Sequence, residues 1–307
     1  MFITFIYTGD VKPKDKMMSE NQSTSIAVTE IDLKVCNSED TLILPNDRRE
    51  CDIRSICALS DGLFLVVDHG NEKLKRLDSA YRLVDSIYVE NIRDVCEIHP
   101  GLAASAMFSR LCGMVQLISY GMSLTKTKCF VVNDVCRSLT YIDGRLFVCH
   151  PTYVATYSLN GELLQTFKHD RQSQPLFTSI WGIGKNVAQR LIYVCDDEFG
   201  IVLLELKENL HRTVNSIDNT LVPRGICVTS TGHVVLCDKD SNSVMHIIPQ
   251  GLRLKTILSH EDGIDKPRAV YYDSKRKKML VACIGSSKMK VFSLEKTVLE
   301  ELSLVVL

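Results

Sequence analysis

An arginine-bearing motif recurs along this chain at nearly constant intervals, and this regularity constrains the fold more than any other feature. The motif is found in the segments IRSICALSDG, IRDVCEIHPG, CRSLTYIDG, TSIWGIG, PRGICVTSTG and PRAVYYDSK. Aligning them places these residues in one register: Arg54, Arg93, Arg137, Thr178, Arg224 and Arg268. The steps between them are 39, 44, 41, 46 and 44 residues. Self-similarity at a period of about 40 to 50 residues is typical of propeller blades.

Short apolar runs rich in β-branched and aromatic residues follow the motif, and Gly, Asp or Asn separates them, as expected of strands and turns. The sequence therefore predicts an all-β fold, a six-bladed β-propeller with four-stranded antiparallel blades. It forms a single domain over residues 26–307, preceded by a leader, 1–25, that we expect to be disordered, since residues 8–25 are polar and have no hydrophobic period. The expected blades cover approximately residues 52–89, 91–132, 135–170, 178–218, 222–263 and 265–302.

A propeller of this kind has to join its first blade to its last, because an open seam would expose two sheet edges. Residues 26–36 alternate as a strand and are a candidate to pair with the last blade. Residues 298–306 are the alternative source of that outer strand. The sequence favours the first of these two closures.

The 12 cysteines contain no CxxC, and no two are closer than six residues, which excludes the paired ligands of zinc fingers, RING and B-box modules. Cys149, Cys195, Cys237 and Cys283 align at one position of the second strand, where the first blade has Val67. We therefore expect them to be buried as small hydrophobic residues. The thiols are expected to be reduced and the protein cytoplasmic.

The charge balance gives no reason to expect whole-molecule attraction to nucleic acid or to a membrane. Lys and Arg number 36 against 37 Asp and Glu, a formal net charge of −1. Hydrophobic residues make up 45% and charged residues 24% of the chain, as in a folded globular protein. We expect no membrane partner, and any charge-based function has to be local.

Residues 62–87, GLFLVVDHGNEKLKRLDSAYRLVDSI, resemble the NHL repeat, and residues 232–257 match its pattern nearly as well. The whole resembles the six-bladed NHL propellers at the C-terminal end of divergent invertebrate TRIM-type ubiquitin ligases. This resemblance implies a non-catalytic scaffold that recognises a protein substrate or partner in the ubiquitin pathway. The alternative that it implies is an RNA-binding NHL module. RING, B-box and coiled-coil modules are missing from this sequence, so ligase activity is not carried over.

The repeat signature also contains polar turn residues. Asp68 with Asn71, and Asp238 with Asn242, stand where a strand must reverse its direction. Their side chains can accept backbone N–H bonds that hold such turns, so we assign them a structural role.

The aligned arginines are the candidate ligand-binding residues. Because the first strand of each blade lines the channel, we expect a ring of cations at one channel mouth, with Trp181 in the core or available there for stacking. A carboxylate peptide, a phosphate or an RNA backbone would suit such a ring. Alternatively, carboxylates of the chain, Asp52, Asp94 and Asp134, already neutralise it. The ligand-binding prediction comprises Arg54, Arg93, Arg137, Arg224, Arg268 and Trp181.

No motif for catalysis, metal or cofactor is convincing. The DKDSN run at 238–242 opens like a calcium loop, but Ser243 and Pro249 stand where that loop needs Gly and Glu. We expect no catalytic residue, metal or cofactor, and keep a metal-dependent propeller hydrolase as a second alternative. The basic runs 73–76 and 275–278 are interpreted as solvated faces, with contacts to RNA or acidic peptides as the other interpretation.

Overall fold

The computed structural model of the chain describes residues 31–41, 47, 49–109, 112–170, 172–207, 210–217, 221–229, 232–248, 253–273, 275–286 and 288–298. The expected leader, 1–25, lies outside these residues, as do 26–30 and 299–306.

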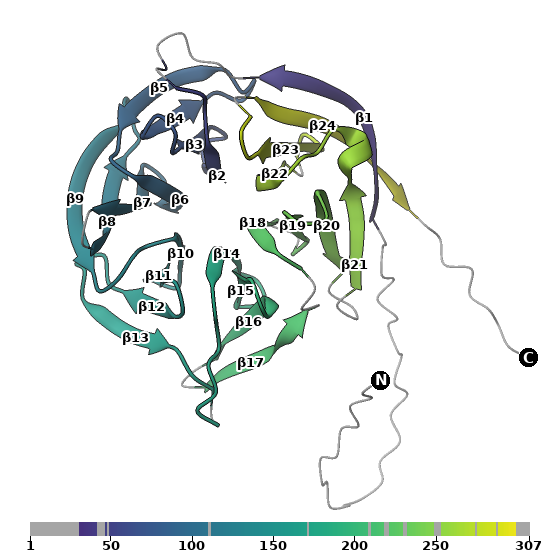
Figure 1. The fold of residues 1–307 in the computed structure, drawn as a ribbon. Helices are drawn as coiled ribbons and strands as arrows, with labels where there is room; N and C mark the ends of the chain where they lie inside the picture. The colour runs from purple at the N-terminus through teal and green to yellow at the C-terminus, as the bar shows by residue number, and fades with distance from the viewer. Residues whose placement is uncertain are drawn as a thin grey trace, which may run out of the picture.

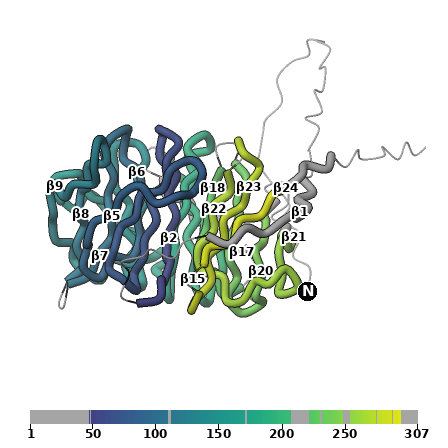
Figure 2. The backbone as a smooth tube through the Cα atoms, turned by 90° about the horizontal axis from the view of Figure 1, so that it is seen from above, coloured from purple at the N-terminus to yellow at the C-terminus, as the bar shows by residue number. Residues whose placement is uncertain are grey.

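The described residues form six four-stranded antiparallel sheets set radially about a central axis (Figure 1). Viewed at right angles, these blades form one squat ring (Figure 2). The all-β, six-bladed fold predicted from the repeat is confirmed. No helix in the described part of the chain is long and apolar enough to cross a membrane.

In blades one to five, the strand nearest the axis comes first in the sequence and the outermost strand comes last (Figure 1). Blade one contains β2 (Ile53–Ala58), β3 (Phe64–Asp68), β4 (Lys73–Leu77) and β5 (Leu83–Tyr88). Blade two contains β6 (Ile92–His99), β7 (Leu102–Ser109), β8 (Cys112–Ser119) and β9 (Thr125–Val132). Blade three contains β10 (Ser138–Ile142), β11 (Arg145–Cys149), β12 (Val154–Tyr157) and β13 (Leu163–Phe167).

The next two blades repeat this order. Blade four contains β14 (Ile180–Asn186), β15 (Leu191–Asp196), β16 (Gly200–Lys207) and β17 (Leu210–Ile217). Blade five contains β18 (Pro223–Val228), β19 (Val234–Asp238), β20 (Ser243–Ile248) and β21 (Arg253–Leu258), and a short 3-10 helix (His260–Asp262) follows it.

Blade six draws its strands from both sides of the ring. It contains β22 (Pro267–Asp273), β23 (Lys278–Cys283), β24 (Met289–Val298) and β1 (Ile31–Thr41). Strand β1 runs antiparallel to β24, with Ile31 opposite Val298 and Thr41 opposite Met289. The outer strand of this blade therefore comes from the N-terminal side of blade one, which gives every blade four strands.

The core lies between adjacent blades, because the middle strands of each blade are covered on both faces. All five residues of β3 are buried, and so are all five of β19. Leu65 and Val67 of blade one, for example, share a cluster with Ala103 and Ile118 of blade two. This double burial explains why the strands read as continuous apolar runs.

Three of the four aligned cysteines occupy one position in the second strand. Cys149, Cys195 and Cys237 are fully buried with free thiols, as packing residues. Cys283 lies one residue further along, since it pairs with Pro267 as Asp238 pairs with Pro223 in blade five. The equivalence expected for Cys283 is therefore wrong, because β23 lacks the terminal Asp that fixes the alignment elsewhere.

In blade one, a strand-end carboxylate links the turn to the start of the inner strand. Asp68 Oδ1 accepts the backbone N–H of Asp52 at 3.1 Å and that of Asn71 at 3.3 Å. The Asn71 amide donates to Asp68 Oδ2 at 2.9 Å. These bonds fix the backbone two residues before Arg54.

Blade five uses the same device. Asp238 accepts the backbone N–H of Val222 at 2.7 Å and that of Ser241 at 3.2 Å. Asn242 adopts a φ of 50°, and its Oδ1 accepts the Lys266 N–H at 2.7 Å. The Asn242 contact therefore also fixes the entry to blade six.

Candidate functional site

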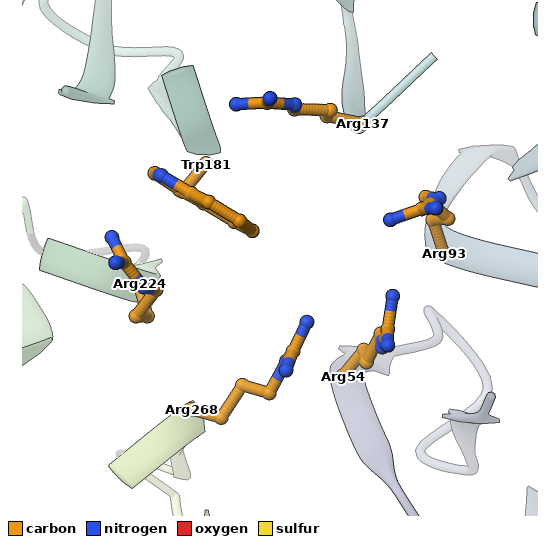
Figure 3. Close-up of a pocket in the computed structure, with 6 residues that line it drawn as sticks. All are labelled: Arg54, Arg93, Arg137, Trp181, Arg224 and Arg268. Atoms are coloured by element: carbon orange, nitrogen blue, oxygen red, sulfur yellow. The ribbon is translucent and has the colours of Figure 1, made fainter. Parts of the chain in front are cut away.

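The inner strands bring six side chains together around the axis, at one mouth of the channel (Figure 3). They line a hollow of about 370 Å³, including its open mouth. One residue from each blade contributes: Arg54, Arg93, Arg137, Trp181, Arg224 and Arg268. We call this set the arginine ring.

A recurring β-bulge places five of these six side chains, and Arg137 directly precedes β10. In blade one, Ile53 pairs with Asp68 and Ser55 with Val67, which leaves Arg54 as the extra residue. The same irregularity occurs at Arg93, Trp181 and Arg268, and in blade five it covers Arg224 and the glycine after it. Bulges re-aim side chains at functional surfaces, which is how a buried inner strand turns long polar residues toward the axis.

The sixth member of the ring is Trp181, so the register that aligned Thr178 with the arginines is wrong. Thr178 lies in the loop before β14, where its backbone N–H and hydroxyl each donate to Asp196 at 2.8 Å. The spacing contained a usable signal, because Trp181 stands 44 residues after Arg137 and 43 before Arg224.

Glycines allow the inner strands to approach each other closely beneath the ring. A Cβ on Gly182 would lie 2.5 Å from the Arg224 carbonyl oxygen, and one on Gly225 would lie 2.3 Å from that of Arg268. A side chain at either position would push apart the backbone that carries the ring.

Two carboxylates neutralise part of the ring. Asp52 pairs with Arg54 at 2.9 Å and lies 4.0 Å from Arg268. Asp197 pairs with Arg224 at 2.5 Å. Asp197 was missed by sequence reasoning, because it reaches from the β15–β16 turn of blade four to an arginine of blade five. Five guanidinium groups share two ion-paired carboxylates, so three of the positive charges have no ion-paired carboxylate of their own among the described residues.

Asp94 and Asp134, expected to neutralise the ring, form no ion pair with a ring arginine among the described residues, although the charge of Asp134 acts on Arg137. Asp94 accepts the hydroxyl of Ser138, the backbone N–H of Leu139 at 2.9 Å and that of Val95 at 2.8 Å. Burial raises the pKa of Asp94, and it lies in a second hollow of about 400 Å³ beneath the ring. Asp134 forms no ion pair within the described residues and accepts the N–H of Val135 at 2.6 Å.

Arg93 is the ring member with the poorest set of partners. Its Nε is buried without a hydrogen-bond partner, and among the described residues no carboxylate pairs with it. Burial, together with the charges of Arg54 and Arg137, lowers its pKa. Burial and the nearby Arg54 likewise lower the pKa of Arg268 to about 10. Both shifts indicate cations held close together without enough negative charge.

Trp181 serves the ring as a spacer rather than as a stacking surface. Its indole lies between two guanidinium groups, with the carbon of Arg137 at 4.7 Å and that of Arg224 at 4.3 Å from the ring centroid (Figure 3). The indole N–H donates to Asp197 at 2.6 Å. The cation–π contacts with the two arginines therefore occupy the indole faces on which a nucleobase would have to stack.

The basic run 73–76 is only partly a solvated face. Lys75 is 1% exposed and contacts Asp47 at 2.6 Å and Asp68 at 2.5 Å. Arg76 is 5% exposed and donates to three backbone carbonyls of blade two, those of Tyr120, Gly121 and Met122. The run joins strands and blades, and the prediction of a solvated or RNA-contacting face is wrong for these two residues. In the run 275–278, three residues are exposed and the fourth is half-buried.

One group of potential metal ligands occurs in the described residues, formed by Asp47, Cys51 and Asp68. The Lys75 ammonium contacts all three, with the Cys51 sulfur at 3.2 Å. Burial raises the pKa of Cys51 to about 11, which keeps the thiol protonated. The Lys75 ammonium supplies the positive charge that a metal ion would otherwise supply. We therefore interpret Asp47, Cys51, Asp68 and Lys75 as a buried ion cluster.

No protein-family model and no curated protein matches this chain. Among solved structures it is similar to the β-propeller domain of Cps50 (Swd1) from Myceliophteria thermophila. The TM-score is 0.59 at 10% identity, over 80% of this chain and 83% of that one. It is also similar to streptogramin B lyase, with a TM-score of 0.56 at 10% identity, over 84% of this chain and 98% of that one. Likeness at this identity shows the propeller fold, and function has to be argued from the site.

Proposed function

We propose that this propeller is a non-catalytic protein-binding scaffold whose arginine ring receives an anionic group of a partner protein. The observation that carries the proposal is the gathering of five arginines in one hollow with only two ion-paired carboxylates among the described residues. Like charges gathered in a partly desolvated site repel one another unless an anion joins them. Arginine suits that task, because its fork of N–H groups binds oxyanions bidentately.

The chemistry of the ring favours binding over catalysis. Guanidinium groups donate hydrogen bonds and stay protonated, so they cannot act as general bases. Asp94, the carboxyl group beneath them, already accepts from Ser138, Leu139 and Val95. Streptogramin B lyase is an enzyme on a similar fold, and metal analysis of the purified protein tests the alternative of a metal-dependent hydrolase. A stoichiometric divalent ion would favour that alternative.

The type of propeller is part of this proposal. The turn residues Asp68, Asn71, Asp238 and Asn242 support an NHL-type scaffold, and with it a role in partner recognition in the cytoplasm, within the ubiquitin pathway. Co-purification with tagged ubiquitin-ligase subunits from a cell extract tests this assignment.

RNA binding is the second candidate, because the same surplus of positive charge attracts phosphodiesters. The observation against it is that Trp181 is flanked by Arg137 and Arg224, which leaves the ring without a free stacking platform. A salt titration of affinity for single-stranded RNA distinguishes the two candidates. Contacts to several phosphates would give a steep log–log slope.

A peptide selection tests the main proposal. A displayed library of random short peptides is selected against the wild type, and the enriched peptides are then bound to Arg93→Glu/Arg268→Glu. We expect acidic peptides to be enriched and to lose binding to this variant, whereas Arg145→Glu, at an exposed position of β11, leaves binding unchanged. Enrichment of peptides without acidic groups, or binding that survives the double variant, would overturn the proposal.

A further inference from the structure

We infer that the anion read by the arginine ring is a phosphomonoester dianion, carried on a phosphorylated side chain of the partner protein. This inference rests on the proposed function and names the chemistry of its ligand. It follows from the charge, the geometry and the depth of the hollow.

The charge of the ring matches a dianion better than a carboxylate. Three positive charges have no ion-paired carboxylate of their own among the described residues, and a bound carboxylate would neutralise one of them. A phosphorylated side chain has about −1.5 to −2 charges at neutral pH. It therefore removes most of the surplus in a single binding event.

The directions of the donors match a tetrahedral group. Arg54, Arg93 and Arg268 approach the centre of the ring from three different blades (Figure 3). A carboxylate offers two oxygens in one plane, whereas a phosphomonoester offers three terminal oxygens that diverge. Three guanidinium groups arriving from different sides can each meet one such oxygen, and Arg93 gains the acceptor that its buried Nε lacks.

The depth of the hollow favours a terminal group over a continuous nucleic-acid backbone. The rim hollow, about 370 Å³ including its open mouth, is small and has room for a single anionic group between the guanidinium groups. The second hollow is lined by Asp94, Ser55 and Ser138 together with four of the ring arginines and Trp181, so the carboxyl group of Asp94 makes it less favourable for an anion than the ring alone. An anion is therefore held at the level of the ring. Each phosphodiester of RNA has a single negative charge and continues on both sides, so it meets neither condition.

The only tryptophan of the chain provides the assay, because Trp181 belongs to the ring. Its fluorescence and its indole N–H resonance are followed during titration with acetyl-Gly-phosphoserine-Gly-amide. The glutamate and unmodified serine counterparts, inorganic phosphate and dimethyl phosphate are titrated in parallel. We expect the phosphoserine peptide to bind at least about tenfold more tightly than the glutamate peptide, since its phosphate has more negative charge and one more oxygen to accept a charge-assisted hydrogen bond.

The pH dependence gives a second readout with a defined sign. The second pKa of a phosphomonoester is about 6, so about a tenth is dianionic at about pH 5 and nearly all at about pH 7.5. Affinity for the phosphoserine peptide should therefore rise about tenfold over that interval. The titratable groups of the protein near the ring have the opposite effect, since their protonation at low pH favours anion binding. Protonating any of Asp52, Asp94, Asp134, Asp197 or His69 at low pH makes the hollow more positive. Arg268, with its pKa lowered to about 10, remains charged throughout.

The variants compare one ring arginine with one outside the ring. Arg93→Gln should weaken phosphoserine binding about tenfold to a hundredfold, the loss expected when a charged hydrogen-bond donor is removed. Arg93→Lys should recover part of it, and Arg145→Gln should match the wild type. Circular dichroism and the melting temperature establish that each variant is folded.

The outcomes separate this inference from the proposed function. Equal or tighter binding of the glutamate peptide, or affinity that does not rise with pH, overturns the dianion and leaves a carboxylate-binding scaffold. Binding of inorganic phosphate alone, without the phosphoserine peptide, assigns the hollow to a free anion and overturns the partner as source. Preference for dimethyl phosphate favours RNA. If no probe changes the Trp181 signal at low salt, both proposals are refuted.

Discussion

Replacing Lys75 with methionine should destabilise the propeller far more than any exposed lysine would. The Lys75 ammonium is 2.5 Å from Asp68 and 2.6 Å from Asp47, and these carboxylate side chains are 0% and 3% exposed. At an effective dielectric constant of about 20, each contact is an attraction of about 6 to 7 kcal/mol before the cost of desolvation. Removing one partner of a buried pair costs about 3 to 5 kcal/mol, because the remaining charge stays buried.

We therefore expect Lys75→Met to lower the free energy of unfolding by about 4 kcal/mol, out of about 5 to 15 for a typical domain. For a domain of this size, that loss corresponds to a decrease in melting temperature of about 8 to 16 °C. Because Asp68 also fixes the backbone at Asp52, the Trp181 signal should report a disturbed ring before global unfolding.

Denaturant unfolding and thermal melting measure this effect, with Lys73→Met as the matched control. Among the described residues Lys73 pairs with Asp47 alone, at 2.9 Å, and its side chain is 25% exposed, so its loss should cost less than about 1 kcal/mol. Lys75→Met/Asp68→Asn should be less unstable than the sum of its single variants, since it removes the orphaned charge. Equal losses for Lys73→Met and Lys75→Met would refute the assignment of a buried ion cluster.

Three further predictions concern the ring and its support. Gly225→Ala should lower the free energy of unfolding by about 1 to 3 kcal/mol, because its Cβ would lie 2.3 Å from the Arg268 carbonyl oxygen. Gly121→Ala is the control, since a Cβ there would have nothing within 4 Å, and equal denaturation midpoints for the two variants would contradict the prediction. Asp197→Asn frees Arg224 from its carboxylate, so the phosphoserine peptide should bind several-fold more tightly in the Trp181 titration; weaker binding would mean that Asp197 positions the ring. The pKa values of Asp47, Asp68 and Asp197 lie below their usual value: burial raises each, but hydrogen bonds from Lys75 or Arg224 outweigh it. Their stabilisation is therefore present above a pH of about 4 and is lost as the pH falls through the lowered values, a trend that stability curves at decreasing pH would check.

The periodic part of the molecule could be predicted from the sequence, and the contacts between blades could not. The spacing of Arg54, Arg93 and Arg137 was sufficient for the blade period, because each blade repeats the same strands. Blade four has no arginine in its first segment, so the alignment settled on Thr178, whereas the bulge geometry selects Trp181. Similarly, the missing terminal Asp of β23 allowed Cys283 to shift by one residue.

Charges were harder to place than strands, for a physical reason. A carboxylate and its partner can lie in different blades, as Asp197 and Arg224 do, and local spacing does not encode that proximity. The run 73–76 looks exposed by composition, yet β4 is an inner layer between neighbouring blades. Its cations therefore have to find partners on both sides, namely carboxylates for Lys75 and carbonyl oxygens for Arg76.

The pairing of β1 with β24 has a consequence for biosynthesis. Translation delivers residues 31–41 before the other described strands and residues 289–298 after them, so β1 waits for its partner while the other five sheets emerge from the ribosome. During that interval, β1 presents unpaired edges to any neighbouring polypeptide. Pairing of β1 with β24 is thus the last step in closing the propeller and the one at which misassembly is easiest. We expect the nascent protein to depend on chaperones most at this step.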